Sequence, residues 1–238
     1  MKVTLINYTQ RAVDLLLFTK QTRLTLSPTL LHEIEQWPQE KKDAELAYMA
    51  KTIPSSWEFV NYVFLVEGVS RAYTHQQVRT RAASYAQQSL RVTNMDEFNY
   101  VFTEKNLASE QAYRAIEACL DRIKDTYSVL RRMGQAPEDA RGILPTNIAT
   151  NIICQFNLRT MAELAKSRTG GRTQNEYITV VNAMVDALVA VHPWAEQFLF
   201  ANHDRHYFDE LEAWAAANLP DMRQRGELLK IIDGMRKT

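Results

Sequence analysis

Residues 71–91 gather most of the side chains that could do chemistry in this sequence. The stretch holds four arginines, a histidine, four glutamines and two serines, and no acidic residue interrupts it. Guanidinium groups stay charged at any working pH and offer planar donors that match a phosphate or a pyrimidine edge, but they cannot act as acids or bases. The stretch therefore predicts a surface that binds and stabilises an anion. Composition alone leaves a solvated basic face equally open.

The spacing within this stretch separates charged groups from neutral ones. Arg79 and Arg81 flank Thr80, and seven residues separate Arg81 from Ser89. The two glutamines before Ser89 supply neutral donors and acceptors of the kind that select a nucleobase or a ribose hydroxyl. No histidine or carboxylate stands beside Ser89 in the sequence to take its proton, so we expect this serine to position a ligand rather than to attack one.

Apolar periodicity predicts the elements that hold these side chains, because strands alternate and amphipathic helices repeat at three-and-four spacing. Gly68 is expected to end the second strand, Asn157 to cap a helix, and Gly134 to terminate another. A short helix is expected to start at Pro137. We expect strands at 2–8, 59–67 and 148–156, and longer helices at 38–51, 68–77, 109–133, 158–167, 174–191, 207–217 and 221–236.

One α+β domain is the economical interpretation of residues 1–238. No linker, internal repeat or low-complexity stretch divides them, and a hydrophobic content of 46% suffices for a sizeable core. Gly170 and Gly171 form the one clearly flexible joint. Residues from about 207 to 238 are expected to form a helical C-terminal extension that packs on the body or on a neighbouring subunit.

The charges of the chain limit its partners. The 28 basic and 28 acidic residues cancel, so neither nucleic acid nor an anionic membrane is an expected partner. No stretch reads as a signal peptide or approaches the ~20 apolar residues of a membrane span. Cys119 and Cys154 lie in apolar-periodic stretches, which predicts buried free thiols in a reducing compartment and hence a cytoplasmic protein. His203 and His206 lack a third ligand nearby, so no metal is expected.

The arginine-rich stretch resembles the signature of the flavin-dependent thymidylate synthases. That family carries Arg-His-Arg, seven residues and Ser, and here Arg79, Thr80, Arg81 and Ser89 stand in the same register. Flanking segments of the family recur as well. Its EGVSRA and HQ segments correspond to residues 67–72 and 75–76, and its ASY and QxSxR-like elements correspond to residues 83–85 and 87–91.

A second block farther along the chain resembles the family independently. Residues 140–145 contain its AR and LP pairs, and Asn157, Leu158 and Arg159 match its flavin-contacting turn. Arg168 falls where the family keeps an arginine against the pyrimidine. Two separated blocks in the right order make chance an insufficient explanation.

The resemblance implies a nucleotide site and a flavin site. Arg168 would be the catalytic residue, because negative charge develops on the uracil ring when a one-carbon unit adds at C5, and an arginine at that edge stabilises it. Nucleotide contacts are implied for Gln76, Arg79, Gln87, Gln88, Ser89, Leu90, Arg91, Arg141 and Arg168. Flavin contacts are implied for Ser55, Arg79, Thr80, Arg81, Asn157, Leu158, Arg159 and Glu163.

The resemblance also implies a reaction and an assembly. Family members methylate dUMP reductively to dTMP, taking methylene from methylenetetrahydrofolate and reducing equivalents from NADPH through FAD. The implied fold is a single α+β domain with a central mixed or antiparallel sheet flanked by helices, in a homotetramer with each flavin at a junction of subunits. Two alternatives stay open: an enzyme that methylates or hydroxymethylates another pyrimidine nucleotide (UMP, dUMP or dCMP), and a non-enzymatic nucleotide or nucleic-acid binder.

The sequence departs from the family where imidazoles are usual. Thr80 replaces the signature histidine, Ile53 replaces a histidine that often contacts the flavin, and the Phe-Glu-His element reads Trp57, Glu58, Phe59. These changes remove hydrogen-bond donors near the flavin and the folate. Thr80 keeps a hydroxyl, so part of the hydrogen bonding can persist.

Overall fold

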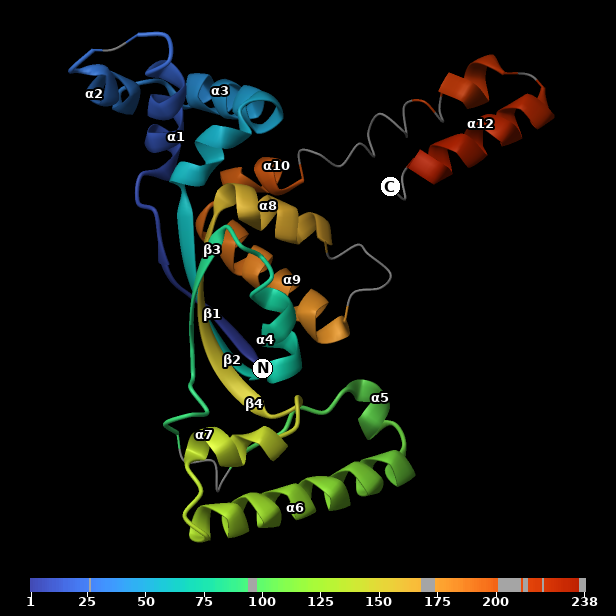
Figure 1. Ribbon diagram of the computed structural model, residues 1–238. Coiled ribbons are helices and arrows are strands. Elements are labelled where there is room, and N and C mark those ends of the chain that lie inside the picture. The colour runs from blue at the N-terminus through green and yellow to red at the C-terminus, as the bar shows by residue number, and fades with distance from the viewer. Residues whose placement is uncertain are drawn as a thin grey trace.

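Four antiparallel strands form the central sheet (Figure 1). Their order is β1-β2-β4-β3, with β1 at Lys2–Tyr8, β2 at Asn61–Ser70, β3 at Ala83–Gln87 and β4 at Ala149–Asn157. The computed structural model describes residues 1–25, 27–93, 98–167, 174–200, 211, 214–219 and 221–235. With helices around the sheet, the chain is an α+β protein, as the sequence predicts.

β2 runs farther than its apolar pattern indicates. The strand continues to Ser70, so the prediction that Gly68 ends it is wrong. Gly68 has a φ of 66°, and the pairing with β4 shifts between Val66 and Val69. Glycine accepts a positive φ without steric strain, and one extra residue at such a point makes a β-bulge. The strand therefore bends at Gly68 and continues.

β3 lies inside the arginine-rich stretch, where the sequence does not predict a strand. Its residues alternate in exposure, with Ala83, Tyr85 and Gln87 turned inward and half-buried. Alanine and glutamine have weak strand preferences, so the local sequence gives little sign of the strand. Pairing with β4 along the whole length of β3 provides the hydrogen bonds.

Three helices lie on one side of the sheet in Figure 1: α4 (Arg71–Gln77), α8 (Leu158–Ser167) and α9 (Asn175–Val191). Their buried side chains share one core with Tyr62, Phe64 and Phe156 of the sheet. α8 and α9 match the expected helices, whereas α4 begins at Arg71 instead of Gly68. Every second residue of β4 is exposed, so the opposite face of the sheet is open along this strand.

A smaller lobe extends from one end of the sheet (Figure 1) and comprises α5 (Glu104–Leu107), α6 (Glu110–Arg132), α7 (Pro137–Ala140) and the 3-10 turn η2 (Arg141–Ile143). The predicted bounds of α6, 109–133, agree with the structure to within one residue at each end. The Ser109 hydroxyl caps its first turn, and Gly134 follows its end with a φ of 87°. Phe98, Tyr127 and Ile148 form the core of this lobe.

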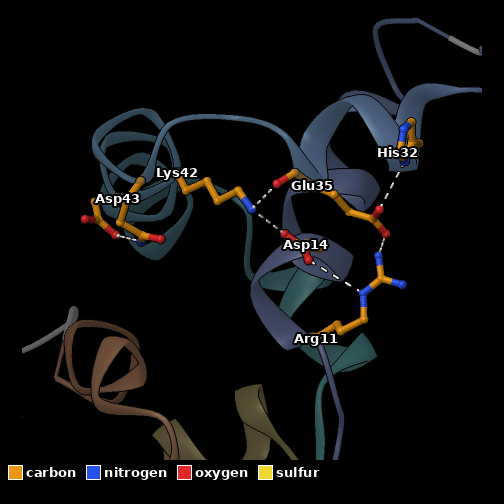
Figure 2. A network of polar contacts seen from close by, with 7 residues as sticks. Arg11, Asp14, His32, Glu35, Lys42 and Asp43 are labelled. Carbon is orange, nitrogen blue, oxygen red and sulfur yellow. Dashed lines mark hydrogen bonds and ion pairs between the residues drawn. The ribbon is translucent and has the colours of Figure 1, made fainter.

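The opposite end of the molecule holds the N-terminal helices α1 (Ala12–Gln21), α2 (Leu30–Glu35) and α3 (Gln39–Thr52), of which only α3 follows from the sequence pattern. Figure 2 shows charged side chains joining all three. Lys42 donates to Asp14 at 2.8 Å and to the backbone carbonyl of Glu35 at 3.2 Å. Arg11 pairs with Glu35 and lies 3.7 Å from Asp14. The network fixes how α2 and α3 lie against α1.

The chain continues beyond α9 through η3 (Pro193–Ala195), α10 (Glu196–Leu199) and α12 (Met222–Met235). The bounds of α12 agree with the helix expected at 221–236, and Figure 1 shows it separated from the sheet. Of the helix expected at 207–217, residues 211 and 214–217 are described, and they are helical. No helix in the described ranges is long and apolar enough to span a bilayer.

Candidate active site

The start of α4 places the first arginine of the basic stretch. The Ser70 hydroxyl accepts a hydrogen bond from the N–H of Tyr73 at 3.0 Å and so caps the helix. The N–H groups of Arg71 and Ala72 donate to backbone carbonyls just before β4, at 3.1 and 2.8 Å. These bonds join α4 to the segment that follows Arg141 in the chain.

The charge of Arg141 acts on Arg71 although the two residues are distant in sequence. Arg71 donates to the backbone carbonyl of Gln88 at 2.6 Å, and its Nε is buried without a partner among the described residues. Burial lowers the pKa of Arg71, and the charge of Arg141 lowers it further. No carboxylate in the described part of the chain pairs with either guanidinium. Two unneutralised guanidinium groups suit a phosphate, which accepts several charged hydrogen bonds at once.

The loop after β3 brings further predicted residues to this pair. Arg91 lies 3.7 Å from the carboxylate of Glu138, whose backbone carbonyl accepts from Arg141 at 3.3 Å. Ser89 accepts from the N–H of Arg91 at 3.2 Å. The loop and η2 are therefore neighbours, and Gln88, Ser89, Arg91 and Arg141 form one basic surface with Arg71.

Two residues predicted for the nucleotide face inward instead of toward this surface. The side chain of Gln87 is half-buried and donates to the Thr74 hydroxyl of α4 at 2.9 Å. Leu90 packs against the core of the smaller lobe. In the described structure both side chains hold the loop in place, and their contacts with a nucleotide remain a prediction.

The signature residues Arg79 to Arg81 follow α4 directly and are held through their backbone. The Tyr85 hydroxyl lies 2.7 Å from the carbonyl oxygen of Gln77 and 2.8 Å from that of Thr80. Burial raises the pKa of Tyr85 to about 12, so this hydroxyl stays a donor. Neither Arg79 nor Arg81 pairs with a carboxylate among the described residues. Both charges are exposed and available to an anion.

The start of α8 lies beside the signature. Asn157 accepts from the N–H of Thr160 at 2.8 Å, which confirms the predicted cap. The Thr160 hydroxyl donates to the backbone carbonyl of Ala82, the residue after Arg81, at 3.1 Å. Asn157 to Arg159 and Arg79 to Arg81 are thus brought together at the N-terminus of a ten-residue helix, an end whose dipole favours anions.

Part of the predicted flavin site lines a cavity of about 170 Å³. Arg159 and Glu163 of α8 line it, as does Pro54 of the 3-10 turn η1 (Pro54–Phe59), next to Ser55. The guanidinium of Arg159 lies 2.7 Å from Glu58 and 3.8 Å from Glu163. The Arg159 side chain is 46% exposed, so the two ion pairs hold the guanidinium at the cavity without removing it from solvent.

Two residues that replace imidazoles of the family differ in exposure: Ile53 is partly buried, whereas Phe59, at the histidine position of the Phe-Glu-His element, is 56% exposed. Trp57 is buried and donates from its indole nitrogen to the backbone carbonyl of Met49 at 3.1 Å. Ile53 is partly buried against the same core. Neither Ile53 nor Phe59 carries a side-chain hydrogen-bond donor, so the donors lost from these two positions are not restored there.

Two further residues extend the site, and the sequence patterns do not assign them a role. Glu176, in the first turn of α9, accepts from the backbone N–H and the hydroxyl of Ser70 at 2.7 and 2.6 Å. Gln174 accepts from the side chain of Gln76 at 2.7 Å. Their only signal in the sequence is a pair of polar residues at the start of a predicted helix.

Some predictions lie outside the described residues or need correction. Arg168, the predicted catalytic residue, lies outside them, as do His203 and His206. Cys154 is a buried free thiol whose pKa burial raises to about 12. Cys119 is also free, but it is exposed, so the prediction that it is buried is wrong. Its turn of α6 faces solvent, although the surrounding pattern is amphipathic.

Comparison with known proteins identifies the family. The family model described as thymidylate synthase complementing protein matches residues 4–194. A flavin-dependent thymidylate synthase of Clostridium tetani is 31% identical over 210 residues, which cover 81% of this chain and 84% of that protein. The chain belongs to the flavin-dependent thymidylate synthase family. A second member, from Nitratidesulfovibrio vulgaris, is 36% identical over 182 residues, covering 70% of this chain and 71% of its own length.

A solved structure shares the fold of this flavin-dependent thymidylate synthase family member. The Helicobacter pylori enzyme, crystallised with FAD and dUMP, superposes with a TM-score of 0.63 at 20% sequence identity. The superposition covers 82% of this chain and 97% of that one. The family match ends at residue 194, so α10 and α12 lie beyond the part that the family model matches.

Proposed function

We propose that this chain methylates dUMP reductively to dTMP, with methylenetetrahydrofolate as one-carbon donor, NADPH as reductant and FAD as cofactor. The observation that carries the proposal is the pair Arg71 and Arg141 beside the Ser89 loop, in a chain of this family. Burial and mutual repulsion both oppose the charge of Arg71, and an anionic ligand offsets both. A nucleotide phosphate is the anion that this family's substrate supplies.

The nucleotide would extend from this phosphate subsite toward the signature. Arg71, Arg141 and Arg91 would hold the phosphate with Ser89, and Gln76 and Arg79, at the exposed end of α4, would reach the sugar or the base. Arg168 would lie against the uracil and stabilise the negative charge that builds up on its oxygens and N3 when the one-carbon unit adds at C5. A permanently charged guanidinium suits that role because it cannot lose its proton at working pH.

The residues at the start of α8 and on η1 fit a flavin nucleotide. Arg79, Arg81 and the N-terminus of α8 would bind its pyrophosphate, and Arg159, Glu163 and Ser55 would line the rest of its path. FAD, when bound, carries reducing equivalents from NADPH to the one-carbon unit. The chain contributes binding, orientation and exclusion of water.

The cavity at Arg159 and Glu163 is small for a cofactor of this size. Its volume of about 170 Å³ is smaller than the ~300–1,000 Å³ of most small-molecule pockets. We infer a homotetramer in which a second subunit closes each flavin site. The open face along β4 offers surface for such contacts.

The proposed compartment is the cytoplasm, because the two free thiols fit a reducing environment. The proposed organisation is one domain with additional C-terminal helices.

Thr80 favours a second candidate, an enzyme that methylates or hydroxymethylates UMP or dCMP. A threonine at the signature position gives a smaller and neutral side chain beside the predicted flavin contacts, and this change can accompany a different pyrimidine.

The decisive experiment is NADPH oxidation by the flavin-loaded protein with dUMP, UMP and dCMP in parallel. The product's mass separates a methyl from a hydroxymethyl addition. We expect dUMP to be methylated and the purified protein to carry the yellow absorbance of a flavin. Colourless protein that takes up no flavin and shifts single-stranded DNA would instead establish a nucleic-acid binder and refute the proposal.

A further inference from the structure

A chain of side-chain hydrogen bonds connects the first turn of α9 to the exposed end of α4. Glu176 accepts from the Ser70 backbone N–H at 2.7 Å and from the Ser70 hydroxyl at 2.6 Å. Gln174 donates from Nε2 to Glu176 at 3.3 Å. The Oε1 of Gln174 accepts from Nε2 of Gln76 at 2.7 Å. Gln76 is exposed, whereas Gln174 and Glu176 are half-buried.

The carboxylate at the inner end fixes the direction of every bond in this chain. An ionised carboxylate only accepts hydrogen bonds, so Gln174 must turn its NH₂ group toward Glu176. The oxygen of Gln174 then faces outward and must meet a donor, so Gln76 turns its own NH₂ group toward Gln174. An amide's orientation is set by its hydrogen-bond network in this way. The oxygen of Gln76 is left on the side away from α9.

Glu176 also acts on the helix that carries Gln76. The Ser70 hydroxyl, which donates to Glu176, accepts from the N–H of Tyr73 and caps α4. One carboxylate therefore holds both the start of α4 and, through Gln174, the amide near its end.

We propose that Glu176 and Gln174 are positioning residues that hold Gln76 as a hydrogen-bond acceptor, so that the site selects a nucleotide presenting a donor there. This inference rests on the proposed function, in which Gln76 meets the nucleotide. Two groups of dUMP are donors of the right kind: the 3′-hydroxyl of the sugar and N3–H of uracil. Cytosine presents a lone pair at N3, so an acceptor fixed opposite it leaves two lone pairs facing each other.

The test measures nucleotide binding to the flavin-loaded protein by calorimetry, without turnover. The ligands are dUMP, dCMP and 2′,3′-dideoxyuridine monophosphate, which lacks the 3′-hydroxyl. We expect the wild type to bind dUMP at least about tenfold more tightly than one of the two analogues, the factor for one well-made hydrogen bond. The analogue that loses affinity identifies whether the donor lies on the base or on the sugar.

Gln174→Met removes the amide and keeps the length of the side chain. We expect it to reduce the preference for dUMP toward unity, because Gln76 can then turn either way. Gln111→Met, on the exposed surface of α6, is the matched control and should keep the full preference. Glu176→Gln lets the side chain at position 176 donate as well as accept, so it should also reduce the preference for dUMP over the analogues. This second variant replaces Gln174→Met in the test if Gln174→Met does not fold.

A rescue separates positioning from general loss of structure. In the Gln174→Met background, Gln76→Glu supplies an acceptor whichever way the side chain turns, and we expect the preference for dUMP to return. The inference is overturned if folded Gln174→Met keeps the full preference for dUMP, or if the double variant does not regain it. In either case, dUMP binding by the wild type leaves the proposed function standing. A wild type that binds no pyrimidine nucleotide refutes the proposed function, and with it this inference.

Discussion

At the scale of single residues, Arg141 gives the most direct test of the phosphate subsite. Arg141→Leu should weaken dUMP binding by about 2 kcal/mol, roughly thirtyfold, because it removes a charged hydrogen bond to the phosphate. Binding by the wild type should also fall more steeply with salt than binding by the variant. Calorimetry at two ionic strengths measures both effects.

The matched control for Arg141 is Arg114→Leu, on the exposed face of α6, where the arginine pairs with Glu110 at 2.6 Å. This change should leave the dissociation constant of dUMP unaltered. Equal affinities for wild type and Arg141→Leu would show that the phosphate does not bind between Arg71 and Arg141.

Thr80, which replaces the signature histidine, tests whether this family member uses dUMP or another nucleotide. The Tyr85 hydroxyl holds the backbone carbonyl of Thr80, a contact that any side chain at position 80 can keep, so Thr80→His should leave the loop in place. We expect the variant to keep or raise the rate of dUMP methylation, because an imidazole restores a donor near the flavin. Steady-state turnover with dUMP measures this. Loss of turnover with dUMP still bound would point to a relative specialised for another nucleotide.

At the scale of elements, the bulge at Gly68 lets β2 bend and continue to the start of α4. Gly68 has a φ of 66°, and a Cβ there would lie 3.4 Å from the backbone nitrogen of Met1. Gly68→Ala should lower the free energy of unfolding by about 1–2 kcal/mol, the cost of a left-handed conformation for a residue with a Cβ. Urea unfolding measures it. Gly142→Ala, where an added Cβ meets nothing within 4 Å, should cost clearly less; equal losses would contradict this account.

Elements with strong periodicity follow from the sequence, and those fixed by pairing do not. α6, α8 and α9 carry apolar stripes and caps that predict their bounds to within about a residue. β3 has no such pattern, since Ala83 and Gln87 have weak strand preferences and β4 supplies the ladder. The continuation of β2 past Gly68 also depends on partners, because β4 pairs with both sides of the bulge.

At the scale of the whole molecule, His192 should make folding sensitive to acid. The ring is buried beside Tyr8 and Trp194, and its Nδ1 lies 3.0 Å from the Tyr62 hydroxyl. Burial lowers the pKa of His192. The unfolded chain then binds this proton more readily than the folded one, so the free energy of unfolding should fall as pH drops below about 6.5, the ordinary pKa of histidine.

Urea unfolding between about pH 8 and pH 5 checks this dependence on His192. His192→Asn should lose part of the acid sensitivity, although it should also be less stable at neutral pH because the ring packs in the core. His75→Asn, at an exposed position of α4, should keep the full dependence. A wild type whose stability is flat between pH 7 and the lowered pKa of His192 would contradict the assignment.

The sequence by itself determined the family and the α+β class, and it predicted that the basic stretch binds an anion, because these depend on residue types and spacing along the chain. Only the tertiary structure decided that the charge of Arg141 acts on Arg71, that Gln87 turns inward to Thr74, and that hydrogen bonds through Gln174 connect Glu176 to Gln76. Such contacts join segments far apart in sequence, and their geometry depends on how β2, β3 and β4 pair and on where α9 packs. Patterns within one short segment of the sequence therefore do not predict these contacts.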